Sequence, residues 1–167
     1  MSMLARMLPA LLLTCTLAGS AAAVEWRDWN AGLSAAAASG RPVLVDVYTD
    51  WCGWCRRMDR DVYGRADVAR YLSRKFVTIR LNAESSESVT YRGRSMTARS
   101  LASSFDVSGY PTSLFLTSDG EHLVNVPGYV EAGRFLLLLR YVGDGHMERG
   151  VKWDEFVKRS AAQGAAR

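Results

Sequence analysis

The 167-residue chain has only three cysteines and two histidines. Three cysteines are too few for a disulfide-rich scaffold, and too few for a zinc site made of two cysteine pairs. It also lacks a run of like charges, since 21 basic and 17 acidic residues are scattered along it and leave a net charge of +4. Such a mixture is typical of a solvated surface, so we expect no nucleic-acid partner. Without repeats or biased tracts, the chain is expected to form one domain.

Long apolar runs are also absent, except near the N-terminus. Arg6 is followed by "MLPALLLTCTLAGSAAA", a leucine-rich stretch that ends in small residues. This order, with Ala21 and Ala23 in a small-x-small pattern, predicts a signal peptide over residues 1–23 and a mature chain that starts near Val24. The protein would then be exported to the periplasm. If the segment is not cleaved, it would act as a membrane anchor instead.

Cleavage would remove Cys15 and leave Cys52 and Cys55 as the only cysteines, in a compartment where disulfides form. A disulfide between residues so close in sequence closes a very short loop and would stabilise the fold little. The two histidines, His122 and His146, are far from the pair and from each other, which disfavours zinc. These points favour a redox pair over a structural staple.

Copper(I) is the metal that the sequence leaves open, because it accepts fewer sulfur ligands than zinc needs. Met58 and Met96 could add thioether ligands to the two cysteines. The alternative from another functional class is therefore a copper-binding or copper-assembly protein.

Hydrophobic periodicity and turn residues predict helices that alternate with strands. The predicted helices cover residues 26–40, 54–62, 66–75, 97–105, 131–142 and 153–162, and the predicted strands cover residues 42–48, 76–82, 112–116 and 122–126. The polar, aperiodic segment 83–96 is predicted to be a long loop. Strand–helix–strand order predicts parallel strands, and the last two strands read as a hairpin. We expect an α/β fold with a central mixed β-sheet flanked by helices and a C-terminal helical extension over residues 151–163.

The cysteine pair lies where a predicted buried strand gives way to a helix. Free N–H groups and the positive end of the helix dipole at this position stabilise a thiolate, so the pKa of Cys52 should fall below the free value of about 8.5. We expect Cys52 to be the exposed nucleophile. Cys55, one turn later, should be more buried and able to attack a mixed disulfide.

Three separated segments resemble the thioredoxin superfamily. They are "VLVDVYTDWCGWC", similar to its active-site strand and turn, "GYPTSLFL", similar to its cis-proline segment, and "DGEHLVNVPGYVEAGRFLLLL", similar to its closing hairpin and helix. The resemblance covers about residues 25–142 and implies a thioredoxin fold for a single domain over residues 24–167. More narrowly, the chain resembles exported reductases of the SoxW kind and the C-terminal domain of DsbD.

This resemblance implies roles for individual residues. Cys52 matches the attacking cysteine and Cys55 the resolving one, while Asp46 matches a buried acid that exchanges protons with the resolving cysteine. A carboxyl among apolar neighbours has a raised pKa, which suits that role; the alternative is a hydrogen-bonded polar group at a strand edge. Pro111 matches the cis-proline that faces the cysteines.

The resemblance also implies a binding rim around Cys52, made of Trp51, Trp54 and Tyr110. The backbone of Tyr110 would pair with an extended client segment. Trp54 could equally belong to the core. It also departs from the family, since the dipeptide between the cysteines of thioredoxin is Gly-Pro, and this dipeptide influences redox balance.

We therefore expect an exported, monomeric thiol–disulfide oxidoreductase that reduces disulfides in proteins or peptides. It would need no metal and no cofactor beyond the Cys52–Cys55 disulfide. A membrane electron donor of the DsbD or CcdA kind would keep it reduced. A disulfide oxidase or isomerase with the same residues is the enzymatic alternative.

Overall fold

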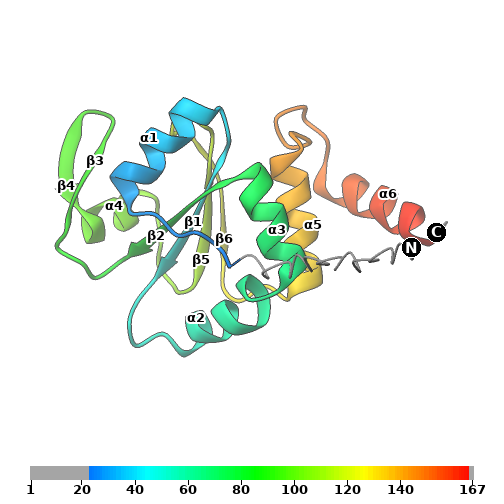
Figure 1. The fold of residues 1–167 in the computed structure, drawn as a ribbon, viewed down its shortest axis with the longest axis horizontal. Helices are drawn as coiled ribbons and strands as arrows, with labels where there is room; N and C mark the ends of the chain where they lie inside the picture. The colour runs from blue at the N-terminus through cyan, green and yellow to red at the C-terminus, as the bar shows by residue number, and fades with distance from the viewer. Residues whose placement is uncertain (1–22, 166–167) are drawn as a thin grey trace, which may run out of the picture.

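Four strands form the central sheet, in the order β2-β1-β5-β6 (Figure 1). The computed structural model describes residues 23–165, so the predicted signal peptide lies outside the described residues except for Ala23. The strands of the sheet are β1 (Val43–Tyr48), β2 (Val77–Asn82), β5 (Thr112–Leu116) and β6 (His122–Pro127). β1 pairs in parallel with β2 and antiparallel with β5, and β5 pairs antiparallel with β6. The predicted mixed sheet is thus confirmed.

Helices cover both faces of this sheet (Figure 1). The helices are α1 (Trp29–Ser39), α2 (Gly53–Met58), α3 (Ala66–Lys75), α4 (Ala98–Ser104), α5 (Ala132–Gly143) and α6 (Trp153–Ala165). α1 and α4 lie on one face, and α3 and α5 lie on the other. Both ends of α1 are capped, because the Asp28 carboxylate accepts a hydrogen bond from the Ala31 N–H at 2.8 Å and Gly40 ends the helix at φ 67°.

The alternation of β1 divides the hydrophobic core into two clusters. Val43, Val45 and Val47 point into the cluster under α1 and α4, whereas Leu44 points into the cluster under α3 and α5. All four side chains are fully buried, as expected for a central strand covered on both faces. Asp46 therefore shares a face with Leu44, on the side of α3 and α5.

The prediction of a loop over residues 83–96 is wrong, because most of this segment forms a β-hairpin. Strands β3 (Ser88–Tyr91) and β4 (Arg94–Thr97) pair antiparallel as a separate two-stranded sheet. The two turn residues, Arg92 and Gly93, both have positive φ, 49° and 73°, which is the backbone of a type I′ hairpin turn. The Trp29 indole N–H donates to the Thr90 carbonyl at 3.0 Å and ties the hairpin to α1.

The predicted helix over residues 54–62 is also only partly right. α2 begins directly after Cys52, as expected, but it gives way after Met58 to a π-helical turn, η1 (Asp59–Tyr63). The Gly64 N–H bonds the Asp59 carbonyl five residues earlier at 2.8 Å, which widens this turn.

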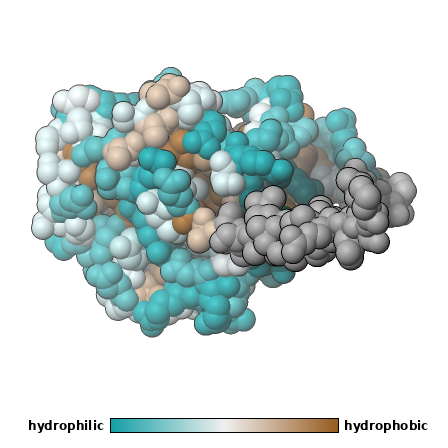
Figure 2. All heavy atoms as spheres, viewed as in Figure 1, coloured by the Kyte–Doolittle hydropathy of each residue, from teal (hydrophilic) through white to brown (hydrophobic). Residues whose placement is uncertain are grey.

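α6 confirms the predicted C-terminal helix and extends slightly beyond it. The Phe156 side chain of α6 is buried, and its ring lies near that of Tyr141 in α5, with the ring centroids 5.3 Å apart. Within residues 23–165, no helix is long and apolar enough to cross a membrane. On the face shown in Figure 2, hydrophobic residues appear in small separate patches among hydrophilic ones.

Candidate active site

The cysteine pair lies at the end of the central strand, where β1 leads into α2. The Cys52 N–H donates to the Thr49 carbonyl at 3.2 Å, and Cys52 is the N-cap of α2. Its Sγ accepts a hydrogen bond from the Cys55 N–H at 3.0 Å. A disulfide joins Cys52 and Cys55, whose Cα atoms are 5.3 Å apart. The structure therefore confirms the predicted position of the pair at the start of a helix.

The predicted difference in exposure between the two cysteines is wrong for this disulfide form. Cys52 is 3% exposed and Cys55 is 4% exposed, so neither sulfur is open to solvent in preference to the other. The low exposure of Cys52 has a local cause, because its sulfur is bonded to the sulfur of Cys55 and also accepts a hydrogen bond from the Cys55 N–H.

Two exposed aromatic residues, Trp51 and Trp54, directly precede the two cysteines in the chain. Trp51 is 65% exposed and Trp54 is 54% exposed, and they are the only large hydrophobic residues exposed in the described part of the chain. The Trp51 ring meets the Tyr110 ring edge to face at 6.0 Å, and its indole N–H donates to the Glu84 carboxylate at 3.0 Å. Tyr110 precedes Pro111 through a cis peptide bond, as the resemblance implied.

Trp54 does not join Trp51 and Tyr110 but forms a second aromatic group. Its exposure shows that it is not a core residue. The Trp54 and Tyr129 rings lie 5.6 Å apart, and the Arg57 guanidinium lies 5.2 Å from the first ring and 5.3 Å from the second. A cation over two aromatic faces holds both rings in place, so this side of the site is built of three interacting side chains.

Asp46 is buried beneath the site in the centre of the sheet, not at a strand edge. Its side chain is accompanied by Arg80, whose Nε donates to a carboxylate oxygen of Asp46 at 3.2 Å, and by Tyr63, whose hydroxyl donates to the other at 3.4 Å. Burial raises the pKa of Asp46 to about 6, although Arg80 opposes the rise. A carboxyl with this pKa can accept or release a proton near neutral pH.

Arg80 connects Asp46 to a second carboxylate. Its terminal nitrogen donates to both oxygens of Asp59 at 2.6 Å, while its guanidinium lies 4.8 Å from the centre of the Tyr48 ring. Asp59 thus pairs with Arg80 and not with an arginine of α2. Of the two arginines of α2, Arg57 donates to the Asp61 carboxylate and Arg56 donates to the Asp50 carbonyl.

Sequence reasoning missed Arg80 and Tyr129, although each leaves a signal. Arg80 is the one charged residue within the predicted strand over residues 76–82, and the register of β1 with β2 places it opposite Asp46. Tyr129 follows Gly128, whose positive φ of 82° marks a turn at the end of β6. The pairing of strands, which the sequence does not specify, was needed to bring these residues to the site.

The methionines proposed as extra copper ligands lie apart. Met58 is fully buried in the cluster under α3 and α5, whereas Met96 packs against the cluster on the opposite face of the sheet. Among residues 23–165, no three side chains of His, Cys, Asp or Glu gather as a metal site.

Comparison with known families gives this geometry a context. The profile of the thioredoxin-like domain family matches residues 29–143, which include the cysteine pair, Asp46 and Pro111. The chain belongs to the thioredoxin-like family. The matched residues of this thioredoxin-like protein hold the Cys52–Cys55 disulfide.

Individual relatives agree with this family. A thiol:disulfide interchange protein DsbD of Pseudomonas sp. is 32% identical over 117 residues, which are 68% of this chain and 18% of the relative. A DsbD of Ralstonia nicotianae is 36% identical over 107 residues, 64% of this chain and 16% of the relative. The thioredoxin-like chain thus spans less than a fifth of these relatives.

Two solved structures share the fold of the thioredoxin-like protein. A thioredoxin-fold protein from Helicobacter pylori superposes with a TM-score of 0.62 at 21% identity, covering 74% of this chain and 82% of that one. A thioredoxin from Thermus thermophilus gives a TM-score of 0.58 at 27% identity, covering 74% and 95%. These likenesses confirm the predicted α/β thioredoxin fold.

Proposed function

We propose that this protein is an exported oxidoreductase that reduces disulfides in other proteins or peptides. The observation that carries the proposal is the Cys52–Cys55 disulfide at the start of α2, which is flanked by exposed aromatic rings. Once the pair is reduced, the backbone N–H that now bonds the Cys52 sulfur would stabilise its thiolate. Cys52 is therefore the nucleophile, and Cys55 is the resolving residue.

The reaction transfers two electrons from the dithiol to a client disulfide. The Cys52 thiolate attacks one client sulfur, the client S–S bond breaks, and the second client sulfur leaves as a thiolate that takes a proton from solvent. Cys55 then loses its proton to the Asp46 carboxylate and attacks the Cys52 sulfur. The Cys52–Cys55 disulfide forms, and the first client sulfur leaves as a thiolate.

Client binding is assigned to the residues that flank the disulfide. Trp51 and Trp54 offer apolar faces on either side of it, and Tyr110 contacts Trp51. The backbone of Tyr110, next to Pro111, would pair with an extended client segment by strand addition. This mode would place a client cysteine opposite Cys52 without requiring one particular client sequence.

Export and the source of electrons complete the proposal. Export rests on the predicted signal peptide over residues 1–23, with an uncleaved membrane anchor as its variant. A monomer that works outside the cytosol needs a membrane donor to reduce the pair again, and the relatives named thiol:disulfide interchange protein DsbD support a donor of the DsbD or CcdA kind. The disulfide is the only redox group that the proposal requires.

The reduction potential of the Cys52–Cys55 couple tests the direction of the reaction. Equilibration with glutathione or dithiothreitol buffers should give a value near that of thioredoxin, about −270 mV. A value near −120 mV would instead make the protein a disulfide donor, the enzymatic alternative.

Trapping experiments test the assigned order of the two cysteines. A Cys55→Ser variant should accumulate a mixed disulfide with an oxidised client, because Cys52 attacks but nothing resolves the product. The matched Cys52→Ser variant should trap far less. Tight stoichiometric copper(I) binding by the reduced protein, together with no disulfide exchange, would favour the copper-binding alternative over any oxidoreductase.

A further inference from the structure

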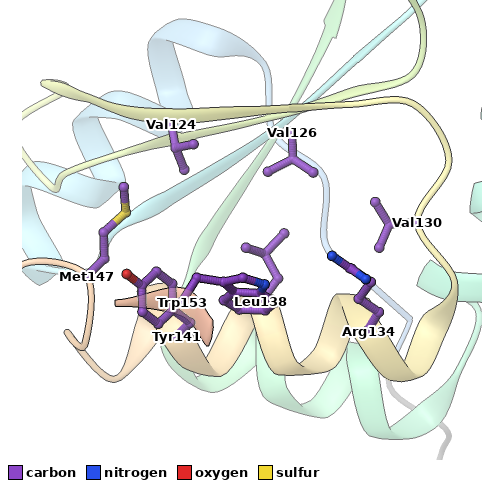
Figure 3. A pocket seen from close by; sticks show the side chains of 8 residues that line it. All are labelled: Val124, Val126, Val130, Arg134, Leu138, Tyr141, Met147 and Trp153. Carbon is purple, nitrogen blue, oxygen red and sulfur yellow. The ribbon is translucent and has the colours of Figure 1, made fainter. Parts of the chain in front are cut away.

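A cavity of about 360 Å³ lies between the edge strand β6, helix α5 and the start of α6 (Figure 3). Val124 and Val126 form one wall, because alternate residues of a strand point to the same face. Leu138 faces them from α5, and Trp153 of α6 closes the side. None of the residues that line this cavity belongs to α2 or carries a sulfur of the redox pair.

The shape of the cavity follows from the spacing of its residues along α5. Arg134, Leu138 and Tyr141 are four and three residues apart, so they share one face of the helix. This face extends over about 10 Å, at 1.5 Å per residue. The cavity is therefore a slot that runs parallel to α5, long enough for an extended alkyl chain.

The charge in the slot is confined to one end. Arg134 is exposed, and Figure 3 shows its guanidinium reaching from α5 toward Val130 and β6. No ion pair joins Arg134 to another residue within 23–165. The nearby Glu131 carboxylate instead caps α5 by accepting from the Gly133 N–H at 3.3 Å. An apolar slot with one unpaired guanidinium at its end matches an amphiphile with a single negative head group.

We propose that this slot binds a linear aliphatic carboxylate. Its alkyl chain lies between the two valines of β6 and Leu138, and its carboxylate accepts hydrogen bonds from Arg134. A ligand with a cationic head would be repelled by the same guanidinium. The hollow on the other side of Arg134 and Trp153 is lined by two carboxylates, Glu131 and Asp154, against one further cation, Lys158, so a carboxylate is favoured more on the β6 side, where Arg134 is the only charged residue of the lining.

Octanoate is a suitable probe, since its extended chain is of the same order of length as the slot. We would titrate octanoate, octanol and octylamine into protein purified as its host processes it, and follow the backbone amide signals of α5 and β6 by NMR. Octanoate should bind saturably at one site. Octanol should bind about tenfold more weakly, because its uncharged hydroxyl forms no ion pair with Arg134, and octylamine should not bind.

Two substitutions separate the head-group contact from the slot itself. Arg134→Gln should weaken octanoate binding about tenfold and leave octanol unchanged. Arg140→Gln, at an exposed position of the same helix outside the slot, should change neither. Val126→Phe should fill the slot and weaken both ligands.

Three results would overturn the proposal. Equal affinities for octanoate and octanol would show that Arg134 does not bind the carboxylate head group. An Arg134→Gln variant that binds octanoate normally would show the same, and this exposed position is not needed for folding. The absence of amide shifts in α5 and β6 with any of the ligands would show that the slot takes no aliphatic ligand.

Discussion

Among single residues, Asp46 should have the largest effect on the pH dependence of stability. Its pKa is about 6 in the folded protein, against a reference value of 3.8, so the folded state binds the proton more tightly than the unfolded chain does. The resulting stability is fully present below about pH 4 and is lost as the pH rises through 6. A difference of this size corresponds to about 2–3 kcal/mol. It arises from burial of the carboxyl, against the opposing effect of Arg80, and Asp59 adds to it.

Asp46→Asn should therefore gain stability over the wild type as the pH rises. The free energies of unfolding of the two proteins should differ least near pH 4. At pH 8 the difference should have changed by about 2 kcal/mol in favour of the variant. Unfolding of the wild type and the variant by guanidinium at several pH values, both with the Cys52–Cys55 disulfide formed, would measure this difference. Asp154→Asn, at an exposed position of α6, is the control. A difference that stays constant across the range would mean that Asp46 ionises as easily in the folded protein as in the unfolded chain.

Tyr129 should affect client recognition without affecting the chemistry of the pair. Tyr129→Ala removes one ring from the group formed with Trp54 and Arg57, a contact of about 0.5–1 kcal/mol. We expect kcat/KM for a protein disulfide to fall about two- to fivefold, mainly through KM. The rate of exchange with glutathione disulfide should be unchanged, since so small a substrate does not need to contact Tyr129. Tyr129→Phe keeps the ring and should restore most of the loss.

The sequence predicted the chemical centre of the site better than its surroundings. The position of Cys52 and Cys55 could be predicted from short-range order, namely a strand followed by a helix, whereas Asp46 was predicted from the resemblance to the thioredoxin superfamily. Arg80 lies 34 residues after Asp46, and only the parallel register of β1 and β2 makes them neighbours. The burial of Cys52 was missed for a similar reason, because exposure depends on how the surrounding loops close.

At the level of elements, the contact of α1 with the sheet depends on a missing side chain. A Cβ at Gly32 would lie 2.2 Å from Cγ1 of Ile79 in β2, a distance that no packing allows. Both residues are buried, so neither can yield toward solvent. α1 therefore lies as close to β2 as it does because position 32 has no side chain.

Gly32→Ala should destabilise the protein by about 2–4 kcal/mol, since α1 must move away from β2 or Ile79 must leave its rotamer. Gly133→Ala is the matched control in the first turn of α5. A Cβ there meets only the flexible end of Glu131 at 3.4 Å, so the better helix propensity of alanine should make this variant neutral or slightly more stable. Thermal unfolding would compare the two. Equal effects would show that the close approach of α1 is not required.

The elements that the sequence missed have local causes. The β3–β4 hairpin turns at Arg92–Gly93, whereas Asn-Gly or Asp-Gly would have signalled such a turn plainly. Its strands have only four residues each, and β4 has no buried residue, so the alternation of Val89 and Tyr91 in β3 is too short to mark a strand. η1 is invisible to periodicity because one extra residue in a helical turn hardly changes the spacing of apolar positions. Its widened turn carries Asp59 and Tyr63, which bond Arg80 and Asp46.

At the level of the whole molecule, the redox site and the C-terminal extension occupy separate parts of the fold. Figure 1 shows α6 beyond α5, on the far side of α5 from the sheet and away from α2. Trp153 and Phe156 hold it there, with ring centroids 5.2 and 5.3 Å from that of Tyr141. The Tyr141 hydroxyl also donates to the Val151 carbonyl at 2.5 Å. This packing predicts that α6 contributes stability and the wall of the slot, and nothing to disulfide exchange.

A chain that ends at Gly150 tests this division. Loss of the buried Phe156 ring and the Trp153 contact should lower the free energy of unfolding by about 2–4 kcal/mol. Reduction of a protein disulfide, measured as kcat/KM at a temperature where both forms are folded, should stay within about twofold. Phe156→Ser in the full chain should show the same pattern if truncation leaves too little folded protein. A truncated chain that keeps its stability but loses activity toward protein clients, and not toward glutathione, would place α6 on the client-binding surface instead.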